Sequence, residues 1–228
     1  MSCPIAWPAL AAGVAGVPFA NWGTPGAGPG AFLRDPVILE ACSDARLCII
    51  VLPGAETVSN RLFTVGPRRN ARLKGVGERM RLLYPDLPFD TFRTTRAMLR
   101  QAARQDADHF ALLRLEMQEA WIARMVELVD AIAAPTILLW LRPEAPGLDG
   151  PTPLVDPAMV ARVEAHADAL VSVPLDGAQR LPSHDDHVRI AAALSGTVAA
   201  LLAVDPPDPP GGPGLPELKT PRRWGEAF

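Results

Sequence analysis

Basic residues crowd the stretch from residue 61 to residue 81, which holds six arginines and one lysine against a single acid, Glu78. A guanidinium fork holds a carboxylate, sulfate or phosphate through two parallel hydrogen bonds. The candidates for such an anion site are Arg61, Arg68, Arg69 and Arg72. The alternative is a solvated loop whose arginines pair with nearby acids. The whole chain has a net charge of -3, and few aromatic residues interleave with the arginines, so we expect no nucleic-acid partner.

The glycine-rich stretch FANWGTPGAGPGAFLRD, residues 19–35, is a second candidate. Gly26, Gly28 and Ala31 fit the literal pattern G-x-G-x-x-A of dinucleotide-binding turns. Pro29 has no N–H to offer a pyrophosphate, and the acidic residue expected about 20 positions further on is missing. We therefore expect no dinucleotide and no other cofactor. The stretch can also be a plain turn that lets the next helix pack.

Apolar runs of strand length alternate with helical patterns along the chain. Buried strands are predicted at 47–53, 135–142 and 169–174, and a short strand at 17–22. Helices are predicted at 5–16, 31–43, 76–83, 90–104, 107–133, 156–170 and 184–203. This alternation predicts an α/β fold with three layers, α/β/α, around a mostly parallel sheet. Ligand sites of such folds lie at the carboxyl ends of the strands.

Length and composition fit one domain over residues 1–204 and a tail, residues 205–228, that is rich in Pro and Gly and predicted to be disordered. The three cysteines lack metal-ligand spacing, so we expect buried free thiols and no metal. Free thiols favour a reducing compartment, and a cytoplasmic location is expected. No apolar run reaches the length of about 18 residues that a membrane span requires.

The stretch ANWGTPGAG, residues 20–28, resembles the second motif block of the SGNH (GDSL-type) hydrolases. In that block an Asn leads to a glycine whose backbone N–H helps to form an oxyanion hole, a role that the resemblance gives to Gly26. The family carries a Gly-x-Asn block after the next strand. Here Gly54 fits, Glu56 stands at the Asn position, and Asn60 is the alternative donor.

The third SGNH block is Asp-x-x-His before the last helix, and here the sequence reads LPSHDDHVRIAAAL. The resemblance makes His187 the general base and leaves Asp185 as the nearby acid that would orient it, because His184 stands at the Asp position. The alternative is an ordinary helix start. The Gly-Asp-Ser block that would supply the nucleophile is absent from the sequence.

The whole pattern looks closest to an uncharacterised alphaproteobacterial family, a domain of unknown function with an SGNH-like (flavodoxin-like) arrangement. Relative to that family the chain looks N-terminally shortened. The resemblance implies binding of a small anionic or carbohydrate-like ligand at the strand ends. The alternatives are an active esterase or acyl transferase that uses His187, and a non-catalytic partner-binding domain. An uncovered sheet edge would also permit a homodimer.

Overall fold

The computed structural model describes residues 6–143, 154–175 and 182–204, and the predicted tail at 205–228 lies outside them. The first part of the chain forms α1 (Trp7–Ala15), α2 (Pro29–Phe32), α3 (Pro36–Ser43), β1 (Cys48–Val51), η1 (Ala55–Thr57), β2 (Phe63–Val65) and β3 (Leu73–Val76). The rest forms α4 (Glu78–Leu83), η2 (Phe89–Thr91), α5 (Thr95–Gln105), α6 (Ala107–Asp130), β4 (Thr136–Pro143), α7 (Pro157–Glu164), β5 (Ala169–Leu175) and α8 (His184–Ala203).

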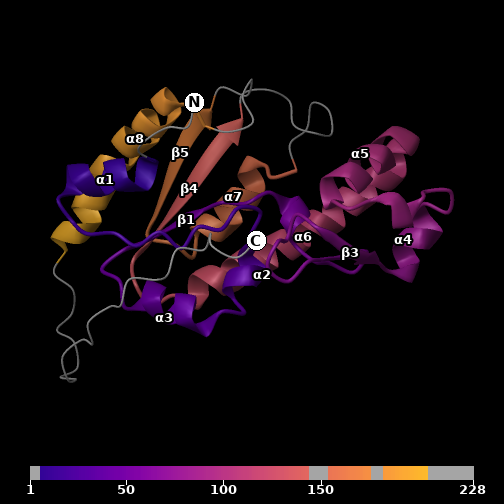
Figure 1. The fold of residues 1–228 in the computed structure, drawn as a ribbon, viewed down its shortest axis with the longest axis horizontal. Coiled ribbons are helices and arrows are strands. Elements are labelled where there is room, and N and C mark those ends of the chain that lie inside the picture. Colours follow the sequence, from indigo (N-terminus) through magenta and orange to yellow (C-terminus); the bar gives the residue numbers. More distant parts are fainter. Residues whose placement is uncertain (1–5, 144–153, 176–181, 205–228) are drawn as a thin grey trace, which may run out of the picture.

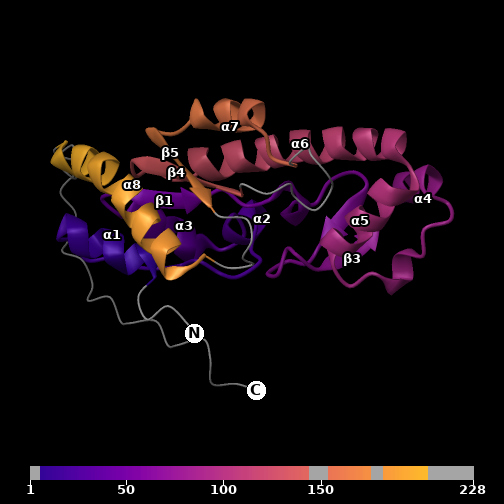
Figure 2. The same ribbon diagram turned by 90° about the horizontal axis from the view of Figure 1, so that it is seen from above.

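The main sheet has three parallel strands in the order β1-β4-β5 (Figure 1). Helices cover both of its faces: α6 and α7 lie on one side of the strands, and α1 and α8 lie on the other (Figure 2). The predicted mixed α/β fold with a parallel sheet between helices is therefore confirmed. Among the described helices only α8 is long and apolar enough to cross a membrane. Its residues Ile190, Leu194 and Val198 pack against the sheet.

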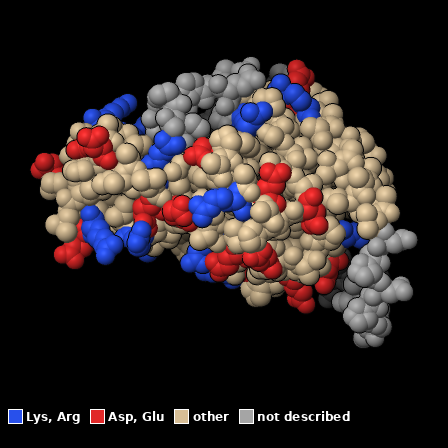
Figure 3. All heavy atoms as spheres, turned by 180° about the vertical axis from the view of Figure 1, so that it is seen from behind, with Lys and Arg blue, Asp and Glu red and all other residues tan. Residues whose placement is uncertain are grey.

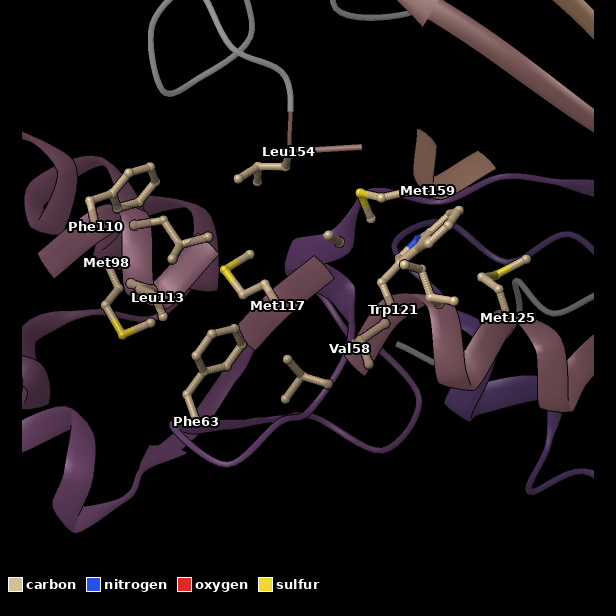
Figure 4. Close-up of a cluster of buried hydrophobic side chains, with 14 of the residues drawn as sticks. Val58, Phe63, Met98, Phe110, Leu113, Met117, Trp121, Met125, Leu154 and Met159 are labelled. Carbon is tan, nitrogen blue, oxygen red and sulfur yellow. The ribbon is translucent and has the colours of Figure 1, made fainter. Parts of the chain in front are cut away.

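The larger core lies along α6, which runs from the sheet to the β2–β3 hairpin (Figures 1 and 2). The face of α6 predicted from three- and four-residue steps is buried, and Figure 4 shows Phe110, Leu113, Met117, Trp121 and Met125 pointing into this cluster. The indole Nε1–H of Trp121 donates to the carbonyl of Pro53 at 2.9 Å, which fixes the helix against the loop that follows β1.

Four sequence predictions about secondary structure were wrong. Residues 17–22 form no strand because no segment that the structure describes pairs with them, and Phe19 is 51% exposed. The helix predicted at 31–43 is two helices, since Pro36 cannot continue a helix and Asp35 caps the second one. The helix predicted at 90–104 starts only at Thr95, after η2 and the extended residues 92–94. The sequence predicted no secondary structure at 63–75, where β2 and β3 form an antiparallel hairpin.

Candidate anion-binding site

The β2–β3 hairpin lies outside the parallel sheet and carries most of the predicted arginines. Its strands pair Phe63 with Val76 and Val65 with Leu73, with a shift in register after Thr64. The residues between the strands, 66–72, are called the arginine turn below. Because side chains alternate along a strand, the apolar residues of the hairpin face the core while Arg72 and Lys74 are exposed on the other side.

A third extended segment, residues 92–94, lies beside the start of β3. The N–H of Leu73 donates to the carbonyl of Arg93 at 3.2 Å, and Arg72 forms an isolated antiparallel bridge with Thr94. The N–H of Thr95 donates to the carbonyl of Ala71, also at 3.2 Å. This pairing brings Arg93, which is 21 positions after Arg72 in the sequence, to the basic hairpin.

The arginine turn, the start of β3 and residues 92–93 line an open groove of about 560 Å³. We call it the arginine groove and define it by its five cationic residues, Arg68, Arg69, Arg72, Lys74 and Arg93. No acidic residue lines the groove, and within the described residues none of the five side chains forms an ion pair. The groove therefore gathers five positive side chains that have no ion-pair partner in the described part of the chain.

The arginine turn is tied to the glycine-rich loop through Asn70, whose side chain is buried with 1% exposure. The N–H of Gly28 donates to Asn70 Oδ1 at 2.6 Å, and Asn70 Nδ2 donates to the carbonyl of Gly66 at 2.6 Å. The N–H of Ala71 donates to the carbonyl of Gly26 at 3.2 Å. These bonds hold the turn in one conformation, which is a requirement for a preorganised ligand site.

The glycines are needed for this contact. Gly26 has φ of 73°, a left-handed conformation that favours glycine. A Cβ atom at Gly28 would lie 2.5 Å from Oγ1 of Thr57 and 2.8 Å from its carbonyl oxygen, so only glycine fits there. In this structure Gly26 serves as an acceptor for the arginine turn through its carbonyl, and Gly28 serves as a donor to Asn70.

Arg61 and Asn60 lie outside the arginine groove. Arg61 forms a bidentate ion pair with Glu116 on α6, and this contact lowers the pKa of the Glu116 carboxyl below its ordinary value. Asn60 Oδ1 accepts the N–H groups of Leu62 and Phe63 at 2.9 and 3.1 Å, which caps the turn into β2. The side chains of Arg61 and Asn60 thus have structural partners.

Glu56 lies on η1, and its carboxylate folds back over Gly54. An oxygen of Glu56 is 3.5 Å from the guanidinium of Arg96, an exposed residue of α5. The position that carries an amide donor in the SGNH block therefore carries a carboxylate that is paired with an arginine here.

His187 and Asp185 lie at the start of α8, at the end of the molecule opposite to β3 (Figure 1). His187 Nδ1 accepts the backbone N–H of Trp7 at 3.2 Å, which joins α8 to α1. Asp185 is exposed, and residues two apart on a helix do not face each other. Within the described residues no hydrogen bond joins the two side chains.

Asp186 is the buried acid at this helix start. It forms a capping box with Ser183, whose backbone N–H donates to Asp186 Oδ2 at 2.8 Å. That bond is the largest of the contacts that lower the pKa of Asp186, and the side chains of Ser183 and Arg189 contribute as well. The role of Asp186 is therefore that of a capping residue, as in the ordinary helix start that the sequence left open as an alternative.

Of the predicted site residues, the structure brings together Arg68, Arg69 and Arg72, with Gly26 bonded to their turn. It does not bring Arg61, Asn60, Glu56, Asp185 or His187 to the groove. Sequence reasoning missed Arg93 and Asn70. Arg93 joins the groove through a strand pairing that leaves no local signal. Lys74 was also missed as a site residue, although it lies in the basic stretch 61–81.

Fold and site together define an α/β domain that carries a cationic groove on a separate hairpin. Residues 2–202 match the model of a family described as a domain of unknown function (DUF6473), and the chain belongs to that family. Comparison with curated proteins and comparison with solved structures each gave no match.

Proposed function

We propose that this protein binds a small anionic ligand in the arginine groove. The observation that carries the proposal is the presence of five cationic side chains around one groove with no acid in its lining and, among the residues that the structure describes, no ion pair to any of them. Like charges this close repel one another, so an anion that enters the groove relieves repulsion as well as forming charge-assisted hydrogen bonds.

The tether of the arginine turn supports this proposal. Flexible surface arginines lose much side-chain and loop entropy when they bind an anion. Here the backbone of the turn is already fixed by Asn70 and by the bond to Gly26, so less ordering remains for the ligand to impose.

Thermal shift with phosphate and sulfate tests the proposal. A ligand at 100 times its Kd adds about 2.7 kcal/mol to the unfolding free energy. For a chain of this size that corresponds to a rise in Tm of roughly 5 to 11 °C. We expect the Arg68→Gln/Arg69→Gln protein to lose most of the rise.

The matched control is Arg100→Gln/Arg104→Gln, which removes the same charge from the exposed surface of α5, outside the groove. This control should respond like the wild-type protein. An equal response of all three proteins to phosphate and sulfate would exclude the groove as the binding site.

An esterase or acyl transferase with an SGNH-like arrangement and His187 as base is the weaker candidate. A general base needs a free lone pair on a ring nitrogen. His187 Nδ1 already accepts from Trp7, so in the neutral ring the proton sits on Nε2. Turnover of p-nitrophenyl acetate that disappears in His187→Ala would revive this candidate.

A further inference from the structure

The cations of the arginine groove come from three separate stretches of the chain. Arg68 and Arg69 lie in the middle of the arginine turn, Arg72 is its last residue and Lys74 lies on β3, and Arg93 lies on the neighbouring extended segment. Residues two apart on one strand have Cα atoms roughly 7 Å apart. The backbone positions that carry the cationic side chains are therefore spread along the groove.

The charge of the groove exceeds what one simple anion can match. A phosphate group at neutral pH carries a charge of about −1.5 to −2, whereas the groove has five cationic side chains. Its volume of about 560 Å³ falls in the range of pockets that hold ligands much larger than one inorganic ion.

From this spread of charge we infer that the arginine groove selects small ligands that carry at least two phosphate- or sulfate-type groups on one scaffold, such as a diphosphate. The inference rests on the proposed function and names the ligand class of the same site. In this arrangement one anionic group contacts the turn arginines, and the second contacts the cations of β3 and the neighbouring segment.

A long nucleic acid is the less favoured occupant. The chain has a net charge of -3, and on the face shown in Figure 3 basic side chains have acidic side chains near them. An extended polyanion would meet acidic groups beyond the groove, whereas a small diphosphate would not.

Isothermal titration calorimetry with phosphate, pyrophosphate, ADP and a 12-nucleotide single strand tests the inference, at constant ionic strength and without divalent cations. We expect pyrophosphate to bind with a Kd at least tenfold lower than that of phosphate. ADP distinguishes a free diphosphate from one that is linked to a nucleoside. Equal Kd values for pyrophosphate and ADP would mean that the groove recognises the diphosphate alone. Tight binding of either ligand supports the inference.

Variants at each end of the groove locate the two anionic groups. Arg68→Gln/Arg69→Gln and Lys74→Gln/Arg93→Gln should each bring the pyrophosphate Kd to within about threefold of the phosphate Kd of the same variant. The control Arg100→Gln/Arg104→Gln should keep the full difference. Tm values without ligand show whether each variant is folded.

Equal affinity of the wild-type protein for phosphate and pyrophosphate overturns the inference and leaves the proposed function intact. Absence of binding by every anion overturns both. Tighter binding of the oligonucleotide than of both diphosphates overturns the inference in favour of nucleic acid.

Discussion

Replacing Asn70 with alanine should weaken both the fold and the anion site, because this one side chain ties the arginine turn to the glycine-rich loop. The substitution removes two hydrogen bonds of 2.6 Å at a position with 1% exposure. It leaves the N–H of Gly28 and the carbonyl of Gly66 without these partners, and both glycines are buried.

The expected loss follows from those two groups. A buried polar group that loses its partner costs about 1–3 kcal/mol, so the loss of two partners in Asn70→Ala should lower the free energy of unfolding by roughly 2–6 kcal/mol. Water that enters the space would bring the loss toward the lower end. Since domains unfold at a cost of about 5–15 kcal/mol, the change is a large share of the total.

Urea denaturation measures this loss, and titration with phosphate measures the effect on the site. The matched control is Asn60→Ala, because the Asn60 side chain also forms two hydrogen bonds with the backbone, here by accepting two N–H groups, but lies outside the groove. Both variants should be less stable, and only Asn70→Ala should bind phosphate more weakly. A loss below about 0.5 kcal/mol in Asn70→Ala, together with unchanged phosphate affinity, would refute the reasoning.

Three other predictions follow from local contacts. Gly28→Ala should destabilise the protein by about 1–3 kcal/mol, measured by urea denaturation, because the new methyl group would lie 2.5 Å from Thr57 Oγ1. Cys42 should react with iodoacetamide with a midpoint near pH 7, since the thiol of Cys48 lowers the pKa of Cys42 to about 7, and Cys48→Ala should raise that midpoint. The lowered pKa of Asp186 contributes stability that is present above the ordinary carboxyl value of 3.8 and is lost as the pH falls through the lower folded-state value. Acid titration of stability should therefore show a smaller decline in Asp186→Asn.

Each of these has an outcome that contradicts it. Wild-type stability of Gly28→Ala would mean that the loop tolerates a side chain at its contact with η1. A Cys42 midpoint that stays the same in Cys48→Ala would show that the two thiols do not interact. Identical acid profiles of the wild type and Asp186→Asn would remove Asp186 from the groups that stabilise the start of α8.

Much of the fold could be predicted because its signals are local and periodic. The buried face of α6 repeats every three to four residues, and β1, β4 and β5 are short apolar runs. Residues 17–22 have the same apolar character but no neighbouring strand, and sequence alone does not reveal whether a partner is present. The β2–β3 hairpin was missed because its strands are three and four residues long and carry polar side chains on the exposed face.

The candidate site was predicted in part for similar reasons. A run of arginines is visible in the sequence, so Arg68, Arg69 and Arg72 were identified. Arg61 belongs to the same run, but it pairs with Glu116, 55 residues away, through a contact that only the packing of α6 creates. Arg93 and Asn70 likewise owe their places to tertiary hydrogen bonds.

The most direct test of the central claim is the Kd for pyrophosphate, whose two anionic groups reach both ends of the groove, of the wild-type protein compared with that of Arg72→Gln/Arg93→Gln. These two residues lie on different segments and meet only in the folded groove. Loss of two charge-assisted contacts, each worth about 1.5–3 kcal/mol, should raise the Kd at least a hundredfold. An unchanged Kd in a folded variant would contradict the claim that the arginine groove binds anions.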